Sequence, residues 1–354
     1  MSGIWIVGAT GRTGRALAAR LAGDHEVVLV GRDATRLQAL ADPLGARVRA
    51  IGSIDRVPAA VRGGDAAVVV NLVGPYPTTG PRLASACPPG THYVDLANEL
   101  DGVRGLLATH DEAVATRRTV VTGAGFGVLA TESVARRLCT GRPAPAAIRV
   151  DGLPSVRSEP GPVGEALAAT VVEGMAAGGR RYDGGRLVPA PPASDVEDLV
   201  LPDGTTARTA GMPSGELEAA YRASGAPRVV AASALAPSGP AARVLLPAVA
   251  TVLGVPLVRR AAIPALARLR LPDRPPARDV SWARARVREV DGTVRTAWLR
   301  AGDAMDFTIA AAAEVTERLA RGEGEPGACT PAAAFGPELA TAAGARFVLD
   351  DETV

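Results

Sequence analysis

Strand-like and helix-like patterns of apolar residues alternate along the first 140 residues of the chain. Short apolar runs are separated by amphipathic segments in which apolar residues recur at helical spacing. The apolar runs lie at residues 4–7, 26–30, 47–51, 66–72 and 119–122, and the amphipathic segments include 34–41, 56–62, 79–87 and 101–117. The run at 66–72 is typical of a central parallel strand that is covered on both faces. This order predicts an α/β fold with a Rossmann-type, doubly wound parallel sheet.

The pattern changes after a composition shift at residues 141–145. Strand-like runs at 147–153 and 228–234 flank helical segments, and two alternating runs around Asp291-Gly292 predict a β-hairpin. We therefore expect a second, α+β domain with a mostly antiparallel sheet. The predicted boundaries are 1–140 for the nucleotide-binding domain, 141–305 for a substrate or dimerisation domain, and 306–354 for a segment that returns to the first domain.

The first strand leads directly into glycines at a G-x-x-G-x-x-G spacing, followed by a helix. Gly8 permits a sharp turn, Gly11 lets backbone amides approach a pyrophosphate, and Gly14 allows close packing of the helix on the strand. The helix begins with its positive dipole end facing the phosphates. We expect the intervening residues Thr10, Arg12 and Thr13 to border the same phosphates.

The end of the second strand predicts NADP(H) as the cofactor. An NAD site usually places a carboxylate there for the ribose hydroxyls, whereas this chain has Arg32, with Arg36 one helical turn later. A guanidinium is suited to the 2′-phosphate of NADP. The alternative is that Arg32 is a solvated loop residue and that Asp33 binds the ribose.

Residues at the ends of later strands are candidates for the rest of the cofactor and for catalysis. Ser53 follows the third strand. At the end of the fourth strand and directly after it, we expect Asn71, Val73, Gly74 and Pro75 to lie beside the nicotinamide. Tyr76, His92 and Asp95 are the candidate proton donors or acceptors. Tyr76 could instead cover the cofactor as an aromatic lid, His92 could be structural, and Asp95 could cap the following turn.

Composition excludes several other classes of site. The sequence contains no lysine, so all 39 Lys or Arg residues are arginines, which excludes a Schiff base and the Tyr-x-x-x-Lys pair of short-chain dehydrogenases. A net charge of +2 and 3% aromatic residues do not favour nucleic-acid binding. The three cysteines and three histidines have no metal-site or disulfide spacing. Because the nucleotide motif begins almost at the first residue, we expect no signal peptide and a cytoplasmic protein.

Several motifs together resemble a known family. They are GATGRTG at 8–14, GR at 31–32, VNLVGPY at 70–76, CPPGTHYVDLANE at 87–99, GAGFGVLATE at 123–132 and GEPGACTPAAAFGPEL at 324–339. This combination resembles the saccharopine dehydrogenase-like NADP-dependent oxidoreductases, which include the trans-acting enoyl reductases of actinobacterial lipid and polyketide pathways.

The resemblance implies an NADP-dependent oxidoreductase that takes hydride from NADPH. Saccharopine reductases reduce an imine, and trans-acting enoyl reductases reduce a carbon-carbon double bond on a carrier-bound chain. We therefore expect reduction of a C=N or C=C bond in a lipid, secondary-metabolite or amino-acid-derived biosynthetic intermediate, as a small molecule or bound to a carrier. A non-catalytic NADP(H)-binding sensor or scaffold is the alternative from another functional class.

The segment 244–258, VLLPAVATVLGVPLV, has no charged residue but is too short and too interrupted by proline to span a membrane. Arginines lie on both sides of it. It could lie on an anionic membrane, as in a membrane-surface, lipid-linked enoyl reductase, or cover an apolar substrate. The favoured alternative is that it is buried in a domain core or at the interface of the homodimer that we expect.

Overall fold

A computed structural model describes residues 3–156, 161–191, 193–271 and 276–349. The chain forms two compact units. The first unit consists of Met1–Gly125 and Thr308–Ala343, and the second of Phe126–Phe307 and Gly344–Val354. The functional division of the chain at residues 140 and 305 stays a prediction.

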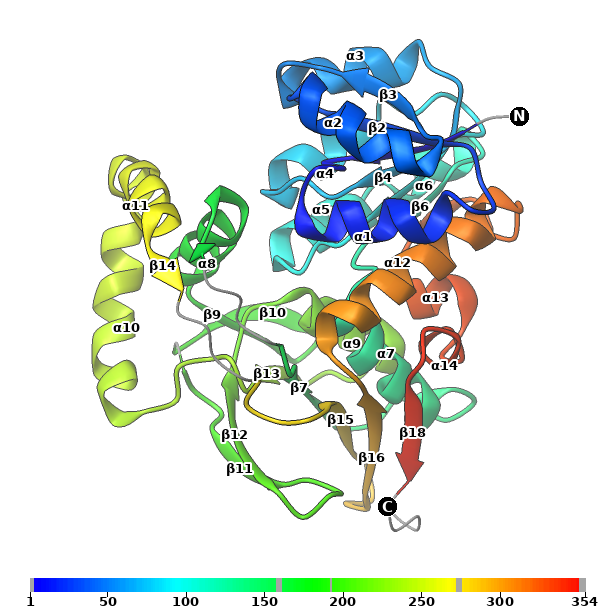
Figure 1. Cartoon of the computed structure of the whole chain (residues 1–354). Helices are drawn as coiled ribbons and strands as arrows, with labels where there is room; N and C mark the ends of the chain where they lie inside the picture. Colours follow the sequence, from blue (N-terminus) through cyan, green and yellow to red (C-terminus); the bar gives the residue numbers. More distant parts are fainter. Residues whose placement is uncertain (1–2, 157–160, 192, 272–275, 350–354) are drawn as a thin grey trace. The chain divides into compact units, whose positions relative to one another are not determined.

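The first unit is built on a seven-stranded sheet in which every neighbouring pair is parallel (Figure 1). The spatial order is β17-β6-β5-β4-β1-β2-β3. The strands are β1 Gly3–Val7, β2 Val27–Gly31, β3 Arg47–Ala50, β4 Ala66–Asn71, β5 His92–Asp95, β6 Thr119–Val121 and β17 Gly327–Cys329. The strand order reverses between β4 and β1, which confirms the predicted Rossmann-type sheet and defines its ligand-binding crevice.

Helices connect these strands and cover the sheet. They are α1 Arg12–Leu21, α2 Ala34–Ala41, α3 Val57–Arg62, α4 Tyr76–Ala84, α5 Leu100–Leu107, α6 His110–Ala115, α12 Ala304–Ala320, α13 Pro331–Phe335 and α14 Leu339–Ala342, with short 3₁₀ turns η1 Asp42–Leu44 and η2 Ile54–Arg56. The first unit contains α12 from Thr308 onward.

Two helices differ from the sequence-based expectation. The helix predicted from residue 79 begins at Tyr76, because proline is favourable in a first turn and Pro77 occupies one. The helix predicted over 101–117 is two helices, α5 and α6. The Thr109 hydroxyl donates to the Leu106 carbonyl at 2.7 Å, a local bond that competes with a continuous helix.

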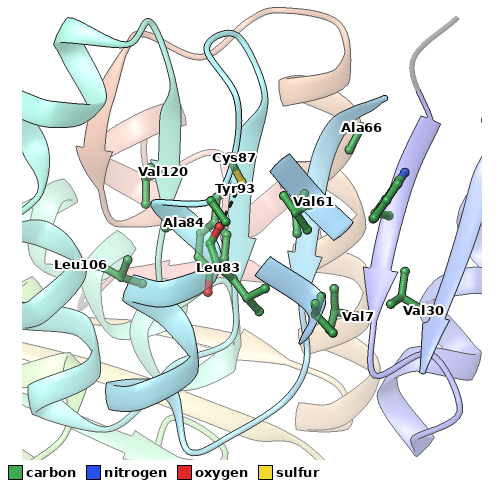
Figure 2. Close-up of a cluster of buried hydrophobic side chains, with 14 of the residues drawn as sticks. Val7, Val30, Val61, Ala66, Leu83, Ala84, Cys87, Tyr93, Leu106 and Val120 are labelled. Carbon is green, nitrogen blue, oxygen red and sulfur yellow. Dashed lines mark hydrogen bonds between the residues drawn. The ribbon is translucent and has the colours of Figure 1, made fainter. Parts of the chain in front are cut away.

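The core of the first unit follows the period-2 pattern of its strands. Trp5 and Val7 are buried in one hydrophobic cluster together with Leu83 and Tyr93 (Figure 2). Ile4 and Ile6, which alternate with them on β1, are also buried, at 2% and 0% exposure. Both faces of β1 are therefore covered, as in other doubly wound sheets.

The second unit carries a nine-stranded, mostly antiparallel sheet. Its main order is β10-β9-β13-β7-β15-β16-β18, with β12 pairing both β13 and β11. The strands are β7 Ala147–Leu153, β9 Gly179–Asp183, β10 Arg186–Ala190, β11 Glu197–Val200, β12 Thr206–Gly211, β13 Val229–Ser233, β15 Ser281–Arg288, β16 Val294–Ala301 and β18 Arg346–Leu349; β8 Gly161–Pro162 and β14 Arg270–Leu271 form a separate pair. Among the described strands of this sheet, only β7 and β13 pair in parallel, which confirms the predicted α+β character.

The described helices of the second unit, besides the first residues of α12, are α7 Phe126–Cys139, α8 Glu165–Ala177, α9 Gly215–Ser224, α10 Pro240–Leu253 and α11 Pro256–Arg268. Helices α7 and α9 pack on the sheet, where both contact β7, and they also contact each other. A separate layer consists of α8 with α10 and α11 (Figure 1). Among the residues that the structure describes, no helix is both long and apolar enough to cross a membrane.

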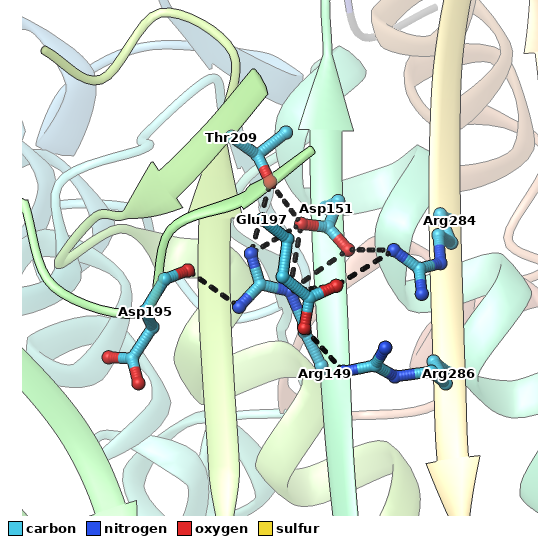
Figure 3. A network of polar contacts seen from close by, with 7 residues as sticks. All are labelled: Arg149, Asp151, Asp195, Glu197, Thr209, Arg284 and Arg286. Carbon is cyan, nitrogen blue, oxygen red and sulfur yellow. Dashed lines mark hydrogen bonds and ion pairs between the residues drawn. The ribbon is translucent and has the colours of Figure 1, made fainter. Parts of the chain in front are cut away.

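A buried ionic network lies on β7 and β15 (Figure 3). Asp151, with no exposed surface, accepts hydrogen bonds from Thr209 at 2.7 Å and pairs with Arg149 at 2.9 Å and Arg284 at 3.4 Å. Glu197 on β11 pairs with the same two arginines at 3.6 Å and 3.3 Å. The network therefore attaches the β11–β12 hairpin to the centre of the sheet.

We predict that Asp151→Ala lowers the free energy of unfolding of the second unit by about 3–5 kcal/mol, because Arg149 and Arg284 would lose a buried counter-charge. Denaturant unfolding followed by circular dichroism measures this. The matched control is Asp198→Ala, which removes an exposed carboxylate paired with Arg208 at 2.7 Å and should change stability little. Equal losses in the two variants would contradict a special role for the buried network.

Candidate functional site

The turn after β1 is packed so closely that a side chain does not fit at Gly8 or Gly14. Gly8 has a φ of +90°. A Cβ atom added to Gly14 would lie 2.4 Å from the Gly8 carbonyl oxygen and 2.7 Å from Cα of Ala9. Gly11 is the N-cap of α1 and has no side chain to cap the helix, and the start of such a helix favours a bound anion. The turn fits the pyrophosphate of a dinucleotide.

The other predicted residues of this turn lie around it. Thr10 and Thr13 are half-buried, and Arg12 is exposed. The Thr10 carbonyl oxygen accepts a hydrogen bond from Nη1 of Arg15 at 2.9 Å. This bond holds the Thr10 backbone, and contact of Thr10, Arg12 and Thr13 with the phosphates stays a prediction.

At the end of β2, the arginine and the carboxylate have different roles. Asp33 is the N-cap of α2, and its Oδ1 accepts a hydrogen bond from the backbone N–H of Arg36 at 3.0 Å. The side chains of Arg32 and Arg36 are exposed, and within the described residues neither guanidinium has an ion-pair partner. Capping occupies Asp33, so this geometry favours a 2′-phosphate over an unphosphorylated ribose.

Ser53 holds the turn that follows β3. Its hydroxyl accepts a hydrogen bond from the Asp55 backbone N–H at 3.2 Å, which caps η2. Asp55 in turn pairs with Arg82 at 2.6 Å, and the Arg82 guanidinium lowers the pKa of this carboxyl. Ser53 thus shapes the border of the predicted adenine site.

Hydrogen bonds from buried polar side chains fix the loop after β4. Oδ1 of Asn71 accepts from the Val73 N–H at 3.0 Å, and the Thr79 hydroxyl donates to the Val73 carbonyl at 2.5 Å. Nδ2 of Asn71 also donates to the Tyr93 hydroxyl at 3.0 Å. These bonds fix the course of the chain into Gly74 and Pro75, where the peptide bond is cis.

This loop lies beside the glycine turn. A Cβ atom added to Gly8 would be 2.8 Å from Cγ2 of Val73. Because β1 and β4 are neighbours with parallel register, for example Val7 opposite Asn71, their carboxyl ends meet at one edge of the sheet. The phosphate turn and the predicted nicotinamide loop are therefore adjacent at the point where the strand order reverses.

Asp95, at the end of β5, is the centre of a buried hydrogen-bond network. Its Oδ1 accepts from the Thr122 hydroxyl at 2.8 Å and from the N–H groups of Ala97 and Gly123, both at 3.1 Å. Its Oδ2 accepts from the Tyr93 hydroxyl at 3.0 Å. Burial raises the pKa of Asp95 to about 6 even though these donors favour the charged form.

Tyr76 begins α4 and packs against an apolar cluster that contains Ala97, Val103 and Leu107. Burial, together with the negative charges of Asp95 and Glu99, raises the pKa of its phenol well above the usual value. The hydroxyl of Tyr76 therefore stays protonated at neutral pH and is able to donate a hydrogen bond.

His92 is not brought together with Tyr76 and Asp95. It is the first residue of β5, whereas Asp95 is the last. Its Nδ1 accepts a hydrogen bond from the Thr119 backbone N–H at 3.0 Å, and burial lowers the pKa of the imidazole. The ring thus serves to join β5 and β6 at the amino ends of the strands, and a catalytic role for His92 stays a prediction.

Sequence patterns did not indicate the residues that support the site. Thr79 and Thr122 lie outside any recognised motif, and only the tertiary structure reveals their contacts with Val73 and Asp95. No group of three or more His, Cys, Asp or Glu residues within the described ranges is arranged to hold a metal ion.

We predict that Gly14→Ala raises the NADPH dissociation constant by at least about tenfold. An overpacked site typically costs about 1–3 kcal/mol, and about 1.4 kcal/mol is tenfold in affinity. Fluorescence titration with NADPH measures the change. Gly23→Ala is the matched control, because an added Cβ at Gly23 would have no atom within 4 Å. Unchanged affinity in Gly14→Ala would show that this turn does not hold the phosphates.

Arg32→Ala should raise the dissociation constant of NADPH by roughly tenfold to a hundredfold and leave that of NADH nearly unchanged, because a charge-assisted hydrogen bond contributes about 1.5–3 kcal/mol. Calorimetric titration with both nucleotides tests this selectivity. Arg20→Ala, at an exposed arginine in the last turn of α1, provides the control. Equal weakening of both nucleotides would refute the assignment of Arg32 to the 2′-phosphate.

Comparisons with known proteins agree with this geometry. Residues 4–121 match the family model described as the saccharopine dehydrogenase NADP binding domain. Over 133 residues the chain is 35% identical to two curated proteins from two strains of Mycobacterium tuberculosis, each named as a candidate trans-acting enoyl reductase. These matches cover 35% of this chain and 32% of each relative, so the chain spans less than half of the length of the relatives.

Nearly the whole chain has the same fold as a solved enzyme structure. Apo saccharopine dehydrogenase (L-Glu forming) from Saccharomyces cerevisiae aligns with 98% of this chain and 100% of its own, with a TM-score of 0.60 and 14% identity. Residues 4–121 are thus similar to the NADP-binding domain of saccharopine dehydrogenase and are identified as an NADP(H)-binding domain, in a chain whose fold is similar to that of a solved saccharopine dehydrogenase.

Proposed function

We propose that the protein is an NADPH-dependent oxidoreductase that reduces a C=N or C=C bond in a biosynthetic intermediate. The observation that carries this proposal is the meeting of three features at one edge of a parallel sheet. They are the glycine turn at residues 8–14, the rigid loop at 73–75 and the buried carboxylate of Asp95 beside Tyr76. A site that only stored a nucleotide would not need a buried acid and a protonated phenol next to its nicotinamide end.

The residues of the chain divide the work between binding and proton control. When NADPH is bound, it supplies the hydride. The amides at the start of α1 bind its pyrophosphate, and Arg32 and Arg36 bind its 2′-phosphate. The loop at 73–75, fixed by Asn71 and Thr79, gives the nicotinamide ring a rigid wall. Such preorganisation limits the number of orientations in which the substrate can meet the hydride.

Tyr76 is the proposed proton donor. Its hydroxyl remains protonated because burial and the nearby carboxylates of Asp95 and Glu99 disfavour the phenolate. Asp95 acts as a positioning residue that holds Tyr93 and the turn at Gly123 by hydrogen bonds. The carboxylates of Asp95 and Glu99 beside Tyr76 give less support to the alternative in which Tyr76 is only an aromatic lid, since a lid needs no ionisable neighbour. His92 has no part in this proposal, because it lies at the other end of β5.

Two substrate classes remain in the proposal. The name carried by the curated relatives supports a C=C bond, as in an enoyl group. The fold shared with saccharopine dehydrogenase is consistent with C=N chemistry. The small-molecule or carrier-bound form of the substrate, the homodimer and the cytoplasmic location stay expectations from the sequence.

The deciding experiment incubates the protein with NADPH and two panels, α,β-unsaturated thioesters and cyclic imines, and follows the loss of reduced-nicotinamide absorbance. We expect one panel to be consumed. Tyr76→Phe should lower kcat by about 10²–10⁴-fold, the usual contribution of a general acid, and leave the NADPH dissociation constant unchanged.

Tyr221→Phe is the matched control for loss of a tyrosine hydroxyl, since Tyr221 lies on α9 and stacks on Tyr182. A normal kcat in Tyr76→Phe would leave Tyr76 as a lid. Consumption of neither panel, with NADPH binding intact, would favour the non-catalytic sensor over the enzyme.

A further inference from the structure

The helices α10 and α11 of the second unit expose an unusual amount of apolar surface. Within the described residues, twelve large apolar side chains are exposed, and six of them lie between residues 245 and 269. These six are Leu245, Val252, Val255, Leu257, Val258 and Leu269. We call the segment 240–270 the apolar hairpin. Contiguous exposed apolar patches on a folded protein mark interaction sites.

The exposed residues of α10 follow one face of the helix. Leu245 is 60% exposed, Val252 is 54% exposed, and Val255 just beyond the helix is 50% exposed, at spacings of seven and three residues. Leu253, on the inner side, is only 8% exposed, and α10 packs against α8. The helix therefore presents apolar side chains both to its own unit and to its surroundings. An ordinary surface helix would carry polar residues on the outer side.

The charge of the hairpin is entirely positive. Between residues 240 and 271 the sequence has five arginines and no aspartate or glutamate. Arg259 pairs with Glu173 of α8 at 3.0 Å. Arg260, Arg268 and Arg270 are exposed and have no carboxylate partner within the part of the chain that the structure describes.

We propose that the apolar hairpin docks on the surface of an anionic lipid bilayer. Leucine and valine side chains enter the boundary between headgroups and acyl chains, and the arginines bind the anionic headgroups. The arrangement is peripheral, since α10 has 14 residues where a spanning helix needs about 20. The proposal is independent of the proposed reaction and stands whether or not a C=N or C=C bond is reduced.

Other occupants fit the hairpin less well. A second copy of the chain bound through the same face in a two-fold dimer would bring its arginines against those of the first copy, with no carboxylate in either hairpin. An acyl chain bound as substrate would be enclosed in a concave pocket. Side chains that are 60% or 77% exposed, such as Leu245 and Leu257, do not form an enclosure.

Vesicle flotation tests the proposal with the full-length protein. We expect flotation with vesicles of phosphatidylcholine and phosphatidylglycerol, little flotation with phosphatidylcholine alone, and loss of binding as salt screens the arginines. Arg260→Gln with Arg268→Gln should weaken binding to the anionic vesicles, whereas Arg288→Gln with Arg300→Gln, two exposed arginines of the same unit, should not.

The apolar contribution has its own matched pair of variants. The triple change Leu245→Ser, Val252→Ser and Leu257→Ser should reduce the vesicle partition coefficient at least about tenfold, because buried apolar area sets the strength of interfacial binding. The control triple is Val200→Ser, Leu235→Ser and Val290→Ser, which are 71%, 70% and 82% exposed elsewhere in the second unit. Circular dichroism and NADPH titration verify that both triples are folded.

Three results would overturn the proposal. They are the absence of flotation in the unaltered protein, flotation that the hairpin triple does not reduce, and equal flotation with neutral and anionic vesicles. A concentration-dependent dimer that the hairpin triple dissolves, without vesicle binding, would assign the face to a second copy of the chain instead.

Discussion

The first unit depends on the close approach of α1 to the end of β1. There is no room for a Cβ atom at Gly14, because the Gly8 carbonyl and the Ala9 backbone already occupy the space. This contact places the start of the helix at the carboxyl ends of β1 and β4, where a helix favours an anion. The residues predicted to bind the cofactor follow the same edge, since parallel strands deliver their carboxyl ends to one side of the sheet.

A network of buried hydrogen bonds supports the loop at residues 73–75, which is predicted to contact the nicotinamide. Asn71, Tyr93 and Asp95 form one continuous chain of buried hydrogen bonds, from the end of β4 to the end of β5. A buried polar network is stable only when its members are satisfied, and Asp95 accepts four hydrogen bonds. Asp95 belongs to the hydrogen-bond network that supports the loop, and burial of the same residue raises its pKa to about 6.

The second unit separates its charged groups into two environments. Arg149 and Arg284 are buried on the sheet against Asp151 and Glu197, and they anchor the β11–β12 hairpin. Arg260, Arg268 and Arg270 of the apolar hairpin at 240–270 are exposed and have no carboxylate partner within the described residues. Guanidinium groups thus stabilise the fold in one region and remain available to an anionic partner in the other.

Local order along the chain determined much of the first unit. The glycine spacing at 8–14, the apolar runs of the central strands and the arginine after β2 were sufficient to predict the parallel sheet and NADP(H), because turn geometry and strand burial depend on neighbouring residues. The hairpin around Asp291-Gly292 was also predictable, and β15 and β16 pair across it.

Only the tertiary structure decided what the polar residues do. His92 and Asp95 are three residues apart in the sequence, yet they lie at opposite ends of one strand, and the strand direction separates their roles. Thr122 meets Asp95 from 27 residues away because β5 and β6 are neighbours. Residues 244–258 gave an apolar pattern that fits a core or a surface equally well, since hydrophobicity says which side chains avoid water but not whether the folded chain has a place to bury them.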